Sequence, residues 1–90
     1  MSVRHKTVSV GTTATALAIV SDDPDGLITL LISNDSDVSV YIGGPGVTSS
    51  DYGLELPSGG SVDRVITPEE PLYAAVAADT EDVHLLSIEI

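Results

Sequence analysis

Alternating apolar and polar residues along most of the chain predict short β-strands rather than helices. Val38, Val40 and Ile42 share one parity and are expected to face a core, with serine and tyrosine between them facing outward. The most apolar run is Leu27–Ser33, which predicts a central strand with both faces largely covered. In the alanine-rich segment 14–20, Leu17 and Ile19 are expected to face one side of a strand, and the alanines at 14, 16 and 18 the other.

Two alanine-rich segments, 14–20 and 72–78, also have helix potential. Threonines in and beside the first segment, and the proline before the second, favour strands instead. Weaker alternation predicts another strand at 61–67, and a last strand closes the chain. In that last strand, 83–90, the residues expected to face inward are Leu86, Ile88 and Ile90.

Turn-forming residues separate these segments. The clearest turns are predicted at 21–26, 34–37, 57–60 and 79–82. Because Asn34–Asp37 is a short polar connection, the strands on either side of it are expected to pair as an antiparallel hairpin. Segment 43–46, GGPG, is expected to be a turn that needs positive φ angles. About seven to eight short strands bounded by turns predict an all-β fold, a small antiparallel β-sandwich or jelly-roll-like barrel.

The length of 90 residues indicates a single domain near the small end for independent folding. Residues 7–90 are assigned to the β-sandwich, and residues 1–6 to a basic N-terminal arm or the start of an edge strand. The absence of cysteine excludes disulfides and thiolate metal sites. No run approaches the roughly 20 apolar residues that span a bilayer, and the N-terminus does not have the pattern of a signal peptide.

Charge is the strongest signal in the composition. Fourteen Asp and Glu residues face three Lys and Arg residues, which gives a net charge of −11. Such a surface repels nucleic acid and anionic lipid, so neither is expected as a partner. It is explained either by ordinary solubility or by adaptation to high salt, which screens the self-repulsion. Arg4, His5 and Lys6 form a basic segment that is either a docking arm for an acidic neighbour or a frayed terminus.

No catalytic motif is present, so the chain is not expected to be an enzyme. Thr48, Ser49 and Ser50 have no obvious base partner, and His84 is too far from Glu89 for a designed dyad. The glycine-rich segment lacks the lysine and the following helix of a phosphate loop. These absences leave binding or structural roles as the main function classes.

The acidic turns are weak candidates for a calcium site. Asp22, Asp23 and Asp25 are close in sequence but lack the spacing of an EF-hand loop. A site shared with Asp35 and Asp37 requires both turns to lie at the same end of the sandwich. We therefore expect no resident metal and no cofactor.

Three segments of the chain resemble a recurring pattern in small virion structural proteins of tailed viruses of bacteria and archaea. They are 40–48 (VYIGGPGVT), 53–59 (GLELPSG) and 71–74 (PLYA), and the preceding strand ends in Asn34 as in that family. The likeness extends over about residues 7–90. This chain departs from the pattern at Ser58, where the family has a glycine after the proline. The resemblance implies a β-sandwich or jelly-roll-like fold, and the acidic composition would point to a halophilic archaeal host.

The function implied by the resemblance is that of a capsid decoration, cementing or head-fibre type protein on the capsid surface. Its partners would be the major capsid protein or other virion proteins, with assembly in the host cytoplasm as a homo-oligomer, expected to be a trimer. Two alternatives stay open: a carbohydrate- or receptor-binding module of a fibre or tail, and a tail or neck connector. The residues expected at the protein interface are Arg4, Lys6, Tyr41, Pro45, Val47 and Tyr52.

Overall fold

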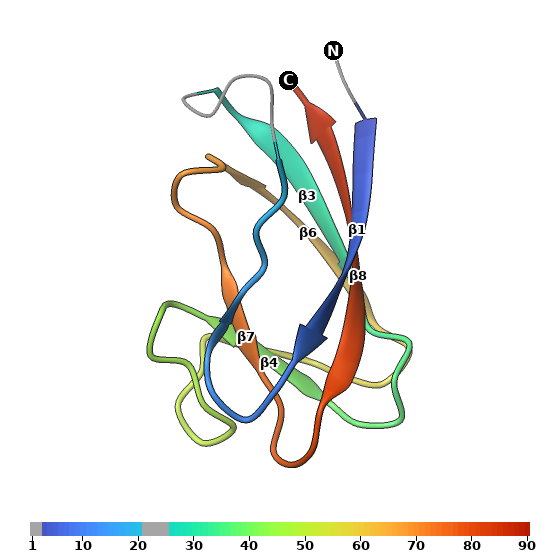
Figure 1. Cartoon of the computed structure of the whole chain (residues 1–90), viewed down its shortest axis with the longest axis vertical. Coiled ribbons are helices and arrows are strands. Elements are labelled where there is room, and N and C mark those ends of the chain that lie inside the picture. Colours follow the sequence, from blue (N-terminus) through green and yellow to red (C-terminus); the bar gives the residue numbers. More distant parts are fainter. Residues whose placement is uncertain (1–2, 21–25) are drawn as a thin grey trace.

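The computed structural model describes residues 3–20 and 26–90, and within these ranges it contains eight strands and no helix (Figure 1). The strands are β1 (Val3–Val10), β2 (Thr15–Ala16), β3 (Ile28–Ser33), β4 (Val40–Gly43), β5 (Leu54–Leu56), β6 (Ser61–Ile66), β7 (Tyr73–Ala75) and β8 (Glu81–Glu89). The predicted all-β fold is confirmed. The two alanine-rich segments contribute only the short strands β2 and β7, in keeping with their threonine and proline content.

The strands form two four-stranded antiparallel sheets. Sheet A has the order β1-β8-β3-β6, and sheet B has the order β2-β7-β4-β5. In Figure 1 the long strands of sheet A run down the right of the view, and the shorter β7 and β4 of sheet B lie at the lower left. Each sheet therefore has two edge strands, β1 and β6 in sheet A, β2 and β5 in sheet B.

The pairing follows a ribbon that is folded on itself, with β1 against β8, β2 against β7, β3 against β6 and β4 against β5. Only β4 and β5 follow each other within one sheet, and every other connection crosses between the sheets. Eight strands nested in this order make a jelly roll. The predicted hairpin across Asn34–Asp37 is wrong, because β3 is paired on both sides within sheet A by β6 and β8, and β4 belongs to sheet B.

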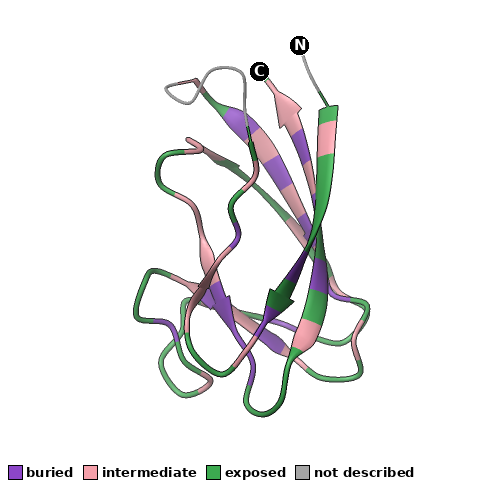
Figure 2. Ribbon diagram, viewed as in Figure 1, coloured by how far each residue is buried: buried purple, intermediate pink, exposed green. Residues whose placement is uncertain are grey.

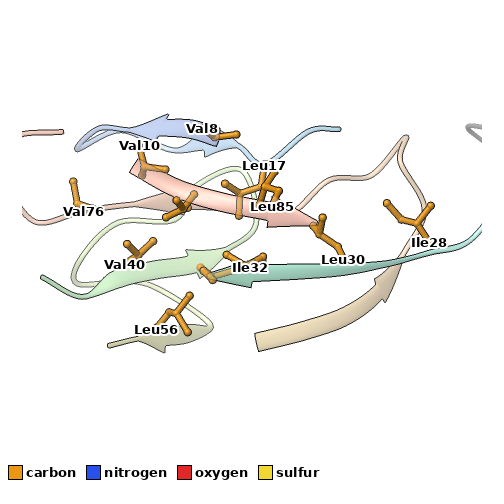
Figure 3. Packing of buried hydrophobic residues seen from close by; sticks show 13 residues of the cluster. Val8, Val10, Leu17, Ile28, Leu30, Ile32, Val40, Leu56, Val76 and Leu85 are labelled. Carbon is orange, nitrogen blue, oxygen red and sulfur yellow. The ribbon is translucent and has the colours of Figure 1, made fainter. Parts of the chain in front are cut away.

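The core lies between the two sheets and consists of aliphatic side chains and alanine (Figure 3). Ile28, Leu30 and Ile32 of β3 are completely or almost completely buried and alternate with residues of intermediate burial, and Figure 2 shows the corresponding purple and pink bands along this strand. Val40 and Leu56 approach them from sheet B. Each such side chain contributes about 1.5–3 kcal/mol by its removal from water. The predicted central strand is confirmed, but only one of its faces is fully buried, whereas the other face, which was also expected to be largely covered, is intermediate in burial.

Strand β8 faces the opposite way from the prediction. Val83, Leu85 and Ser87 are buried, whereas Leu86 is only partly covered and Ile90 is exposed. Two leucines stand side by side in this strand, so the sequence offers an apolar side chain to either face. The pairing with β1 and β3 places Leu85 against the core.

Strand β4 begins two residues later than expected. Val40 and Ile42 are buried as predicted, but Val38 is 42% exposed. The carbonyl oxygen of Val38 accepts hydrogen bonds from the side chains of Asn34 and Ser36. Because those bonds hold Val38 in the turn, it does not reach the sheet.

Asn34 is the centre of a polar cluster that joins the β3–β4 connection to the β5–β6 connection. Its buried side-chain amide nitrogen lies 2.8 Å from the carbonyl oxygen of Val38, 3.0 Å from that of Leu56 and 3.2 Å from that of Pro57. Its side-chain oxygen accepts hydrogen bonds from the backbone N–H and the hydroxyl of Ser36. The backbone carbonyl of Asn34 accepts a further bond from the N–H of Gly59, a residue with φ of 76°.

None of the described residues forms a helix that is long and apolar enough to cross a membrane.

Candidate functional site

The connection between β4 and β5, here called the 44–53 loop, contains three of the six predicted interface residues, Pro45, Val47 and Tyr52 (Figure 1). Its two ends are held together where the N–H of Gly53 donates to the carbonyl of Ile42. A Cβ at Gly43 would lie 3.2 Å from a methyl carbon of Val47 and 3.3 Å from the nitrogen of Gly53. The loop therefore closes on itself through a tight neck, where a larger residue at position 43 would require Val47 or the backbone of Gly53 to move.

The glycines of this loop do not have the positive φ angles that were expected. Among the described residues, Gly59 is the glycine with a positive φ. Gly43 is required for close approach, whereas a Cβ at Gly44 or Gly46 would meet nothing within 4 Å. At position 43 glycine is therefore explained by close contact with its neighbours and not by the predicted positive φ. At positions 44 and 46 neither reason applies.

Residues of the loop tip hold one another through short-range hydrogen bonds. The backbone groups of Thr48 and Asp51 bond in both directions, at 2.8 and 3.3 Å. The hydroxyl oxygen of Thr48 also accepts from the N–H groups of Ser50 and Asp51. Thr48 thus stabilises a turn, and its hydroxyl is engaged by the backbone rather than by a base.

Two of the predicted interface residues, Tyr41 and Tyr52, pack against each other. Their ring centroids are 4.7 Å apart and the rings are tilted by 48°. Tyr41 lies on the outer face of sheet B, and Tyr52 is 44% exposed. A tilted pair at this distance is a favourable aromatic arrangement. It fixes the position of the loop on the sheet and presents one tyrosine ring to the surroundings.

The other two predicted residues of the loop differ in exposure. Pro45 is exposed, but Val47 is only 3% exposed and is packed beside Gly43. A shallow hollow of about 390 Å³ lies over the loop, lined by residues from both of its ends together with Asp51 and Tyr52. Because Val47 is buried in the loop, its side chain is not available to a partner while the loop keeps this conformation.

The basic residues Arg4 and Lys6 lie within strand β1 and not in a separate arm. The strand starts at Val3 and is paired with β8 along its whole length. Nε of Arg4 lies 4.0 Å from a carboxylate oxygen of Glu89. Tyr41, Pro45 and Tyr52 belong to sheet B and its loop, whereas these two bases belong to an edge of sheet A. The predicted interface residues therefore occupy two separate surfaces.

A polar array on the outer face of sheet A was not predicted. The hydroxyl of Thr7 lies 3.1 Å from Nδ1 of His84, and Nε2 of His84 lies 3.4 Å from a carboxylate oxygen of Asp35. Beside it, the hydroxyl of Ser9 donates to Asp82. These residues are distant in sequence. The register of β1 with β8 brings Thr7 to His84 and Ser9 to Asp82, and the register of β3 with β8 places Asp35 near His84, which no local pattern reveals.

This array has the residue types of a nucleophilic triad but not its setting. The side chains of His84 and Asp35 are 50% and 68% exposed. The hollows found beside the loop and beside the edge strands do not include Thr7 or His84. Catalytic triads work in sites with oriented donors for a developing oxyanion. We interpret the array as cross-strand pairing on a solvated face.

The predicted calcium candidates fall into two groups. Asp22, Asp23 and Asp25 lie outside the described residues. Asp35 and Asp37 are exposed, and Asp35 is engaged by His84 and by the hydroxyl of Ser33. Within residues 3–20 and 26–90, no three metal-binding side chains are grouped to hold an ion.

Comparisons of the chain with protein-family models, with curated proteins and with solved structures find no match in any of the three. The resemblance to virion structural proteins thus stays a prediction from the residues of the chain.

Proposed function

We propose that this chain is a virion structural protein of a tailed virus, a decoration or cementing protein that binds the capsid lattice as a homo-oligomer. The observation that supports this most directly is the form of the 44–53 loop. The segments that carry the resemblance contain Gly43 and Gly53, which form the closed neck, and Tyr41, whose partner Tyr52 lies between two of these segments. The result is a preformed surface of small residues, a proline and a tyrosine.

The jelly roll is compatible with this role, since the same architecture occurs in viral capsid domains. It occurs in lectins as well, so the fold alone does not select a function. What favours docking on a protein is the low relief of the surface and the absence of a deep cavity over the loop. In a lattice, many copies that each form a modest contact reach stable attachment through multivalency.

The basic residues of β1 supply a second contact in this proposal. They would lie against acidic groups of a neighbouring virion protein. Such charge contacts weaken as salt screens them, so in high salt the apolar and aromatic contacts of the loop would contribute more of the binding free energy.

Quantitative mass spectrometry of purified virus particles tests the proposal. Decoration of a lattice requires on the order of hundreds of copies per particle, whereas a ring-shaped neck or tail connector requires about a dozen or fewer. Absence of the chain from purified particles would overturn the proposal, and a count near that of a ring would replace decoration by the connector.

The contact surface is tested by particle occupancy of variants. Tyr52→Ala removes the exposed ring of the pair, and we expect it to reduce occupancy at least several-fold because aromatic anchors dominate interfaces. Val65→Ala, which truncates an exposed valine on β6, is the matched control and should keep full occupancy. Equal occupancy for both variants would exclude the loop as the docking surface.

A carbohydrate- or receptor-binding module of a fibre or tail is the second candidate. It is favoured by the exposed ring of Tyr52 beside the hollow that Asp51 also lines, because sugars bind to an aromatic face flanked by polar groups. A glycan array with the isolated protein separates the two candidates. Specific glycan binding that Tyr52→Ala abolishes would favour this second function.

A further inference from the structure

All three Lys and Arg residues of the chain lie on the two edge strands of sheet A. Arg4 and Lys6 are on β1, and Arg64 is on β6. The fourteen acidic residues are not restricted in this way and occur in turns and strands throughout the chain. A chain with so few bases places every one of them where a sheet can be extended by another strand.

The bases of β1 also share the inward direction on that strand. Val8 and Val10 of β1 are core residues, and strand alternation puts Arg4 and Lys6 on the same side. Together with Ile19 of the sheet B side, Arg4 and Lys6 line a hollow of about 360 Å³. Their positive charges therefore stand at the opening between the two sheets.

Arg64 has the equivalent position at the other edge. Val62 and Ile66 of β6 pack against the core, so Arg64, midway between them, has the same direction. It lines a hollow of about 390 Å³ together with Leu54 of β5 and Leu72, which precedes β7, both on the sheet B side. Both openings of the sandwich are thus bordered by a positive charge from sheet A.

The edges of sheet B need no such charge, because they are short. Strand β2 has two residues and β5 has three, whereas β1 has eight and β6 has six. A long edge strand offers a row of unpaired backbone groups to another chain, and short strands or inward-pointing charges are the usual means of blocking such pairing. Length and charge together leave no edge of either sheet open in the described structure.

We propose that these three bases close the edges of sheet A to other copies of this chain. Joining β1 to β1, β6 to β6 or β1 to β6 of a second copy would bring like charges together on the inward side and remove them from water. On the outward side β1 has Val3, His5, Thr7 and Ser9, which supply no permanent charge. The outward side of β6 has Asp63, so two β6 strands would bring like charges together on that side as well. Copies of the chain therefore meet through surfaces other than a continuous sheet.

Neutralising the edges tests this inference. The variant Arg4→Thr, Lys6→Thr, Arg64→Thr keeps strand-compatible residues and changes the net charge from −11 to −14. General charge repulsion predicts less self-association for a more negative protein. Closed edges predict the opposite, so sedimentation velocity should show species larger than the parent's that grow with concentration.

Reversing the charges is the matched control. In Arg4→Glu, Lys6→Glu, Arg64→Glu every edge again has inward charge, and its sedimentation coefficient should equal the parent's. The double variant Lys6→Thr, Arg64→Thr retains the Arg4–Glu89 pair and is measured in place of the triple variant if circular dichroism shows that the latter is unfolded. An unchanged sedimentation coefficient for the neutral variant at every concentration would overturn the proposal, as would equal association of the neutral and reversed variants. The result does not depend on whether the chain belongs to a virion.

Discussion

At the scale of single residues, Asn34 has the most partners for its size. Its buried side-chain amide donates to the carbonyl of Val38 in its own connection and to those of Leu56 and Pro57 at the β5–β6 connection, and its oxygen accepts from Ser36. An unsatisfied buried carbonyl costs about 1–3 kcal/mol, so the cluster is stable only while the side chain that satisfies it is present. The residue looks in sequence like one more polar turn position, yet it ties two connections together at one end of the sandwich.

Replacing Asn34 tests that role. We expect Asn34→Ala to lower the free energy of unfolding by about 2–4 kcal/mol, because it removes a donor from the buried carbonyl of Leu56 and from the partly buried carbonyls of Val38 and Pro57. Urea unfolding followed by circular dichroism gives the value. Ser39→Ala, which removes an exposed hydroxyl bonded to Glu55, is the control and should change stability by less than about 0.5 kcal/mol. A loss below about 1 kcal/mol for Asn34→Ala would contradict the assigned role.

At the scale of elements, the strands were predictable and their partners were not. Alternation located β1, β4, β6 and β8 because one face of each is covered by the core, and a continuous apolar run located β3. It did not identify β6 and β8 as the neighbours of β3, since parity fixes the facing of a strand and says nothing of which strand lies beside it. The predicted hairpin across Asn34 was wrong for that reason. The facing of β8 was predicted the wrong way round because Leu85 and Leu86 are equally apolar.

The candidate site was partly predictable for a similar reason. Tyrosines and a glycine-rich loop are visible in sequence, and the structure brings Tyr41 and Tyr52 together. Whether a valine in such a loop points outward depends on the neck formed at Gly43, which is a contact between residues that the sequence separates. Val47 is buried for this reason, and local pattern had no means of showing it.

The neck of the 44–53 loop gives a prediction with an internal control. Gly43→Ala places a methyl group against Val47 and the backbone of Gly53, and we expect a loss of about 1–3 kcal/mol. Gly44→Ala meets nothing within 4 Å and should be neutral or stabilising by up to about 1 kcal/mol. Thermal unfolding of the two variants compares them directly. Equal melting temperatures would show that the loop does not close as described.

At the scale of the whole molecule, charge is the dominant property. A net charge of −11 on 90 residues opposes the compact state through self-repulsion. Among the described residues, the contact of His84 with Asp35 lies on an exposed face and that of Arg4 with Glu89 at the edge of the sandwich, and two such contacts offset little of it. The described fold is stabilised chiefly by its aliphatic core. Salt screens the repulsion between acidic groups that opposes this stabilisation.

Melting temperatures measured at increasing sodium chloride concentration show how much this charge repulsion destabilises the fold. From low to molar salt we expect the melting temperature to rise by several degrees or more, since screening at about 1 M reduces the Debye length to about 3 Å. A series in sucrose at matched water activity controls for exclusion effects that are unrelated to charge. A melting temperature that stays constant across the salt series would contradict the interpretation of the acidic surface as an adaptation to high salt.

The nested ribbon has a kinetic consequence. Only β4 and β5 can pair after closing a short loop, whereas β1 meets β8 across nearly the full length of the chain. High contact order of this kind makes folding slow, in the range of milliseconds to seconds for small β domains. The hairpin that bears the tyrosine pair is then the natural nucleus, and the outermost strands arrive last. The surface proposed for docking would be in place before the rest of the sandwich closes around it.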